Sequence, residues 1–162
     1  MRAGRVVLGA LCLGAGCTGS APTPGSDEAP VMSRIDSSEV LLRTGQGLGD
    51  PTRAVIRDSL AWEQFWNQAH ALLEPAPPPP SVNFADSMLL VAALGTRSTG
   101  GFSVAIDSVS RGSALRIFVT SIAPGPRCVS TMAISWPVQV VRVARFDGSV
   151  EFVESERTEQ CE

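Results

Sequence analysis

Short β-prone segments with turn sequences between them fill the chain after residue 86, and they constrain the fold more than any other feature. The connections SRGS at 110–113 and FDGS at 146–149 are short enough to favour antiparallel neighbours, and Asp147-Gly148 is a typical hairpin pair. Phe118 points away from the apolar face of its strand, so we expect that strand to be covered on both sides. The expected strands are residues 88–94, 102–109, 114–121, 132–136, 138–146 and 150–153.

One amphipathic helix is expected before these strands. Asp58 or Ser59 can cap its first turn, and Pro75 is expected to end it, ahead of an extended proline run. Upstream, residues 40–42 and 54–56 flank the glycine-rich sequence GQGLGDP and predict a hairpin-like pair. The fold class is therefore α+β, a mainly antiparallel sheet with one helix packed on it. The apolar stripe of the helix is formed by Trp62, Phe65, Trp66, Ala69 and Leu73.

The N-terminal residues predict export. Arginines precede a short apolar run, which is followed by small residues, so residues 1–16 are expected to be a signal peptide. The ending LGAGC resembles a bacterial lipoprotein box with Cys17 as the lipidated residue, although Leu13 lies four places before Cys17 rather than three. Plain secretion and a buried N-terminal helix are the alternatives. Residues 17–32 are rich in proline, glycine, serine and acids and are expected to be a flexible tether for a domain at 33–162.

Two cysteines stand apart from this leader. Cys128 and Cys161 are expected to form a disulfide, because an exported protein meets an oxidising environment. A metal or redox pair is the alternative, but CxxC spacing is absent from the sequence.

Residues for catalysis are scarce. The single histidine, His70, lies off the apolar stripe and is expected to face solvent, and none of the common hydrolase, zinc or phosphate-loop motifs occurs. The net charge is −3 and the arginines form no basic patch, so nucleic acid is not an expected partner. We expect no enzyme activity, no cofactor and no metal.

Four stretches together resemble the PrcB C-terminal domain family over residues 54–153. They are WEQFWNQ, VNFADSMLLVAALGTRSTGGFSVAI, LRIFVTSIAPGPRC and SWPVQVVRVAR. The family contains bacterial exported or lipoprotein domains related to a subunit that stabilises a surface protease complex. The family commonly has tyrosine at the position of Phe102, so the resemblance implies no ring hydroxyl here.

Residues 97–102 are the best candidates for contact with a partner. Gly100 and Gly101 lie between two expected strands, where a turn needs positive φ or a close backbone approach. The Thr99 hydroxyl can bond the turn, and the Arg97 guanidinium can bind a carboxylate or a carbonyl. Trp136 is expected to pack in the core or against the disulfide, or else to anchor a partner beside this turn. The candidate partner-binding residues are therefore Arg97, Thr99, Gly100, Gly101, Phe102 and Trp136.

The expected function is binding in the bacterial envelope, in the periplasm or at the cell surface. The resemblance implies an accessory or stabilising subunit for another extracytoplasmic protein, with a protease as the example that the family suggests, and with a lipid anchor in the membrane. One alternative is a protease inhibitor-like module that inserts the Thr99-Gly100-Gly101 turn and residues 124–128 into an active-site cleft. The other is a small hydrolase that uses His70.

Overall fold

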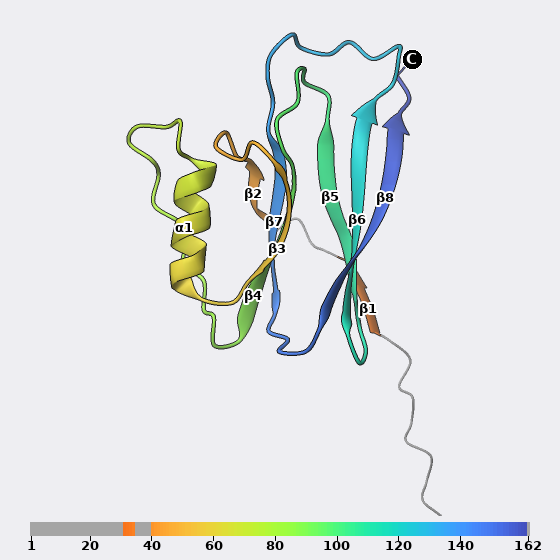
Figure 1. The fold of residues 1–162 in the computed structure, drawn as a ribbon. Coiled ribbons are helices and arrows are strands. Elements are labelled where there is room, and N and C mark those ends of the chain that lie inside the picture. The colour runs from red at the N-terminus through yellow and green to blue at the C-terminus, as the bar shows by residue number, and fades with distance from the viewer. Residues whose placement is uncertain (1–30, 35–39, 162) are drawn as a thin grey trace, which may run out of the picture.

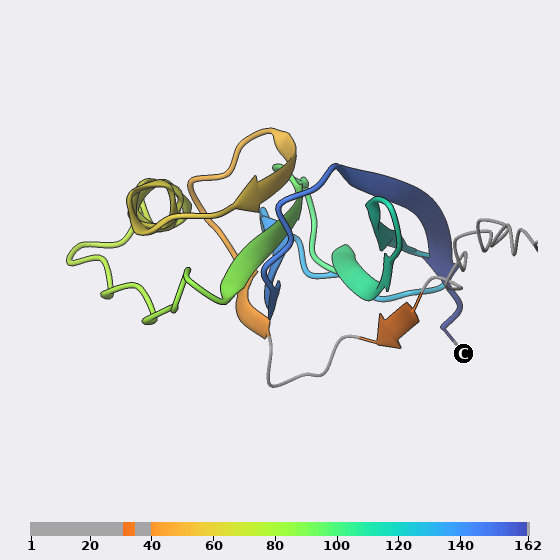
Figure 2. The same ribbon diagram turned by 90° about the horizontal axis from the view of Figure 1, so that it is seen from below.

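The computed structural model describes residues 31–34 and 40–161, and these form two four-stranded sheets and one helix (Figure 1). The α+β fold class is confirmed. The view from below shows three layers, with the helix on one sheet and the second sheet beyond it (Figure 2). The predicted signal peptide, Cys17 and nearly all of the predicted tether lie outside the described residues. The elements are β1 Val31–Arg34, β2 Val40–Thr44, β3 Pro51–Ile56, α1 Ser59–Ala69, β4 Ser87–Leu94, β5 Ser103–Arg111, β6 Leu115–Pro124, β7 Pro137–Ala144 and β8 Val150–Glu159.

The strands are divided between two sheets, and the polypeptide crosses between them several times. Sheet A has the order β1-β5-β6-β8, and sheet B has the order β2-β7-β4-β3. All pairings are antiparallel except that of β6 with β8, which is parallel. The hairpin predicted at Asp147-Gly148 is therefore wrong, because the polypeptide leaves sheet B there and enters sheet A. The hairpin predicted around GQGLGDP is also wrong, since β2 and β3 lie at opposite edges of sheet B.

Strand β4 is buried on both faces and joins the three layers. Its sequence SMLLVAAL sends alternate side chains to opposite sides, as the period of a strand requires. Leu89, Val91 and Ala93 belong to the core under the helix, whereas Leu90 and Ala92 belong to the core between the sheets. Both cores thus depend on one strand.

Helix α1 covers the outer face of sheet B. Asp58, one of the two caps that the sequence predicts, accepts a hydrogen bond from the Ala61 amide at 2.8 Å. The indole N–H groups of Trp62 and Trp66 donate to the carbonyls of Pro80 and Pro77, at 3.0 and 2.7 Å. The buried tryptophans therefore hold the proline-rich segment against the helix and also fill the core.

Several predicted boundaries are wrong. The helix ends at Ala69, before Pro75, and Leu73 is exposed beyond its end. Residues 132–136 form a single bridge between Ser135 and Arg97 instead of a strand. Phe118 is half-buried on the outer face of β6, and the strand with core on both faces is β4.

An arginine links the edge strands of the two sheets. Arg53 on β3 donates from Nε and Nη2 to the two carboxylate oxygens of Glu154 on β8, at 2.7 and 3.0 Å. Its Nη1 also donates to the carbonyl of Ala93 on β4, at 2.7 Å. A bidentate ion pair of this kind fixes the relative position of the two strands better than an ordinary surface ion pair does.

Replacing Arg53 should loosen this link. We expect Arg53→Gln to lower the free energy of unfolding by about 1–2 kcal/mol, because the Ala93 carbonyl also loses a charged donor. Urea denaturation gives the measurement. Arg116→Gln is the matched control, since its 3.5 Å pair with Glu151 is exposed on both sides; an equal loss in the two variants would contradict the role of Arg53.

Candidate functional site

The TGG loop, residues 95–102, connects β4 in sheet B to β5 in sheet A. The amide of Thr96 donates to the carbonyl of Gly49 at 2.9 Å, which fixes the start of the loop to the β2–β3 connection. The loop follows directly after the doubly buried β4, so one end of it is held by the core.

A second segment, which we call the apolar loop (residues 125–136), lies against the TGG loop. Arg97 and Ser135 exchange two backbone hydrogen bonds, at 2.8 and 3.0 Å. The Gly100 amide donates to the Thr131 carbonyl at 3.0 Å, and the Ser135 hydroxyl donates to the Thr99 carbonyl at 2.7 Å. The bond at Thr99 is thus accepted by its carbonyl, whereas the sequence predicted a bond from its hydroxyl.

The paired glycines are explained by this contact. Gly101 has φ +86°, and a Cβ there would lie 2.9 Å from Ser130 Oγ and 3.0 Å from Pro124 Cβ. A Cβ on Gly100 would collide with the hydroxyl of Thr131. Both predicted reasons for glycine, positive φ and close approach, are therefore present. The apolar loop packs against this turn, in which Gly100 is half-buried and Gly101 remains exposed.

A disulfide holds the other end of the apolar loop. Cys128 and Cys161 are bonded, as the sequence predicts, and their separation in sequence is 33 residues. The Cys128 amide also donates to the Gly125 carbonyl at 3.0 Å. The loop is therefore fastened at one end to the residues after β8 and at the other to the TGG loop.

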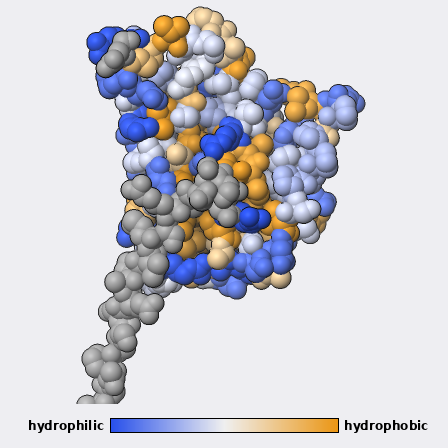
Figure 3. All heavy atoms as spheres, turned by 180° about the vertical axis from the view of Figure 1, so that it is seen from behind, coloured by the Kyte–Doolittle hydropathy of each residue, from blue (hydrophilic) through white to orange (hydrophobic). Residues whose placement is uncertain are grey.

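Three hydrophobic side chains of the apolar loop are exposed. Val129 is fully exposed, Met132 is 92% exposed and Ile134 is 57% exposed. Hydrophobic atoms are visible at the end of the molecule where this loop crosses (Figures 1 and 3). Sequence reasoning missed this surface because it assigned residues 132–136 to a strand. Isolated apolar residues among serines and threonines between two prolines were the signal that could have revealed it.

Arg97 and Phe102 contact each other within the TGG loop. The guanidinium carbon of Arg97 lies 5.5 Å from the centre of the Phe102 ring, which is a cation–π distance. The phenyl ring is half-buried beside the inter-sheet core. Of the six candidate partner-binding residues, these two line the same pocket, which contains about 460 Å³.

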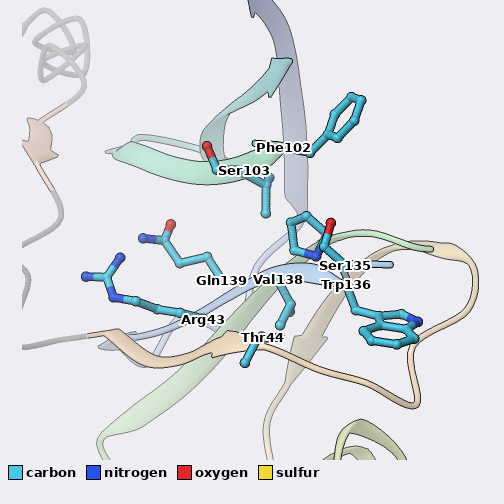
Figure 4. A pocket seen from close by; sticks show the side chains of 10 residues that line it. Arg43, Thr44, Phe102, Ser103, Ser135, Trp136, Val138 and Gln139 are labelled. Carbon is cyan, nitrogen blue, oxygen red and sulfur yellow. The ribbon is translucent and has the colours of Figure 1, made fainter. Parts of the chain in front are cut away.

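Trp136 lies at a second pocket, of about 300 Å³, on the other side of Phe102. Figure 4 shows the Phe102 ring on the β5 side and the indole extending toward the β2–β3 connection, so the two rings do not meet. Trp136 is half-buried and belongs to neither core, and its carbonyl accepts from the Gly45 amide at 3.1 Å. The prediction that it packs in the core is wrong.

His70 is buried, not solvent-facing as predicted. It follows the last residue of α1, and the residue is 8% exposed. Its Nδ1 lies 2.9 Å from the Trp66 carbonyl, and its ring lies 4.2 Å from the Trp66 ring. The backbone turns after Ala69, which brings this side chain back onto the buried face of the helix. The imidazole thus completes the packing of the helix end.

Two further observations concern the described part of the chain. Within it, no three side chains of the types that bind metals come together. No helix there has both the length and the hydrophobicity needed to cross a membrane.

Residues 88–144 match the PrcB C-terminal family. This is the family that the sequence resembles, and the match begins with β4 and ends with β7. It contains the TGG loop and the apolar loop, whereas helix α1 lies outside it. At the level of the family, the match supports a domain associated with a protease complex. No curated protein and no solved structure matches the chain significantly.

Gly101 offers a direct test of the fit between the two loops. We expect Gly101→Ala to destabilise the protein by about 1–2 kcal/mol, because a Cβ is strained at positive φ and meets Ser130 and Pro124. Thermal or urea unfolding gives the measurement. Gly49→Ala is the control, since a Cβ at Gly49 meets nothing within 4 Å; equal effects at the two positions would contradict this explanation.

The disulfide should contribute substantially to stability. The chain-entropy model gives a loss of about 4 kcal/mol when a loop of this length is opened. The double variant Cys128→Ser/Cys161→Ser should therefore unfold at a lower temperature, and a reductant should shift wild type in the same direction. Differential scanning calorimetry tests both, and an unchanged midpoint in the reductant would show that the bond is not present in solution.

Proposed function

We propose that this protein is a non-enzymatic, exported binding module that acts as an accessory or stabilising subunit of an extracytoplasmic protease complex. The exposed apolar loop surface, formed by Val129, Met132 and Ile134, is the observation that carries the proposal. Several large, exposed hydrophobic side chains on one fixed loop are typical of protein-binding sites. The family match supports the protease association, and the predicted signal peptide supports export with a lipid anchor at Cys17.

The attachment of the apolar loop at two points favours binding. A loop that is already fixed loses little conformational entropy when it meets a partner. Here the disulfide fixes Cys128, and the paired backbone bonds to Arg97 fix Ser135. The exposed side chains lie between these two points of attachment.

The burial of His70 weakens the hydrolase alternative. An imidazole that stacks on Trp66 and is bonded to the helix carbonyl is poorly placed to reach a substrate. We therefore propose no catalytic role for it.

An inhibitor-like module is the second candidate function. It is favoured by the full exposure of Val129 next to a disulfide-bonded cysteine, since an inhibitory loop must enter a cleft and stay rigid. The TGG turn is hydrogen-bonded to Thr131 and Ser135, so residues 128–134 would have to enter the protease with it. Assays against serine, cysteine and metallo-peptidases distinguish the two, because a stabilising subunit leaves the peptidase active.

Crosslinking at the apolar loop tests the proposed function. A photoreactive amino acid in place of Met132 should capture a protease or a subunit of its complex in cells that export the protein, and mass spectrometry identifies the product. The same amino acid at Leu72, which is 65% exposed near the helix, is the control. Equal capture at both positions, or products from Met132 that contain no protease component, would refute the proposal.

Polar variants of the loop should separate binding from folding. Val129→Ser/Met132→Ser, without the photoreactive group, should lower recovery of the identified partner in a pull-down at least tenfold, because anchor side chains in an interface contribute roughly 2 kcal/mol or more. Unfolding should change by less than about 0.5 kcal/mol, since both side chains are exposed. Leu60→Ser/Leu72→Ser is the matched control and should leave recovery unchanged.

A further inference from the structure

A pocket beside the TGG loop contains an arginine whose charge is uncompensated. The Nε atom of Arg97 is buried and has no hydrogen-bond partner among the described residues. No described carboxylate lies within ion-pair distance of this guanidinium. A buried donor without an acceptor is costly, and such groups usually indicate a missing partner or a function.

The pocket is open to a ligand and holds a second arginine. It has a volume of about 460 Å³ and lies between the end of β4, the TGG loop and the last residues of β6 and β8. Arg157 on β8 lines it together with Arg97, and Arg157 has no ion-pair partner among residues 40–161 either. Leu94, Phe102 and Ile122 give the pocket an apolar part.

The backbone around Arg97 is already in place for binding. The two hydrogen bonds to Ser135 fix its main-chain position, and the Phe102 ring lies 5.5 Å from its guanidinium carbon. A guanidinium held in this way loses less freedom when it forms a paired bond with a carboxylate.

Glu156 limits the kind of anion that fits. It lines the same pocket, so the lining residues include two positive charges and one negative charge. A phosphate dianion would be repelled by Glu156. A single carboxylate next to an N–H donor would fit better, because the carboxylate can pair with an arginine while the N–H donates to Glu156. Nucleic acid is disfavoured for the same reason, and also by the net charge of −3.

We infer that this pocket binds a single carboxylate of a polypeptide partner through Arg97, with Arg157 as the second cationic group. The carboxylate belongs to an acidic side group or to the C-terminus of the partner, and an adjacent apolar group contacts Phe102. The identification of the ligand as a polypeptide rests on the proposed binding function. The recognition of a carboxylate rests on the pocket alone.

Small probes test the inference without the partner. Nitrogen-15 labelled full-length protein is titrated with three peptides, and the Arg97 Nε–H resonance is followed. The first is acetyl-Ala-Leu-Ala with a free C-terminus, the second is acetyl-Ala-Glu-Leu amide, and the third is neutral acetyl-Ala-Leu-Ala amide. A saturable shift with the first or the second supports the inference and identifies the source of the carboxylate.

Other results would overturn it. If neither carboxylate peptide moves the resonance, or if the neutral peptide moves it equally, the pocket does not recognise a carboxylate. An equal response to inorganic phosphate would show a general anion site.

Variants then assign the binding to the arginine. Because the Arg97 variants lack the Nε–H, their titrations follow the backbone amide resonance of Phe102, which lines the same pocket. Arg97→Gln should bind the recognised peptide at least tenfold more weakly, because a charge-assisted pair contributes about 1.5–3 kcal/mol. Arg97→Lys should retain part of the affinity, since it keeps the charge and loses the planar fork. Arg157 is exposed, so Arg157→Gln should leave folding unchanged. This substitution should also weaken peptide binding. Arg116→Gln, on the outer face of β6, should bind as wild type does.

The peptide titration and the crosslinking experiment at the apolar loop can fail independently of each other. Val129→Ser/Met132→Ser should bind the small peptides normally, because the exposed side chains do not line the pocket. Failure of the titration with successful crosslinking at Met132 would leave the binding function intact and remove only the carboxylate site. The reverse result would remove the apolar loop surface as the partner site.

Discussion

The burial of β4 on both faces is the interaction on which the rest of the structure depends. Leu89 and Val91 need the helix and its tryptophans as cover, whereas Leu90 and Ala92 need sheet A. Removing either layer would expose a continuous apolar face, so the three layers form together. The same strand leads directly into the TGG loop. The candidate site is thus attached to the most deeply buried element, which limits its motion relative to both sheets.

The order of the sheets also explains why the loops gather at one end. Within residues 40–161, the polypeptide moves from one sheet to the other after β4, after β6 and after β7. The first two of these crossings are the TGG loop and the apolar loop, and they bond to each other through Arg97 and Ser135. The third, at residues 145–149, lies at the opposite end, where Arg145 donates to the carbonyl of Phe84 at 2.7 Å. Binding loops on a rigid scaffold commonly occupy one end in this way.

Local patterns predicted the helix, a cap at Asp58 or Ser59 and the need for glycine at 101, because each depends on residues that are close in sequence. The parallel pairing of β8 could not be predicted in the same way. Asp147-Gly148 is compatible with a hairpin, and only the competition between two sheets for the last strand decides the outcome. His70 was misplaced because the helix ends early and the ring folds back onto Trp66. The apolar loop surface was missed because the whole fold decides whether its side chains are buried or exposed.

The two proposed contacts differ in what they would contribute to one interface. The apolar loop surface supplies affinity through desolvation, but it does little to fix the orientation of a partner. A carboxylate bound by Arg97 supplies direction, because the guanidinium accommodates it in few orientations. The backbone pair of Arg97 with Ser135 places both on one rigid unit, next to Ile134. A partner that fits both would be held in a single orientation, which is the property that a stabilising subunit needs and that a simple adhesive surface lacks.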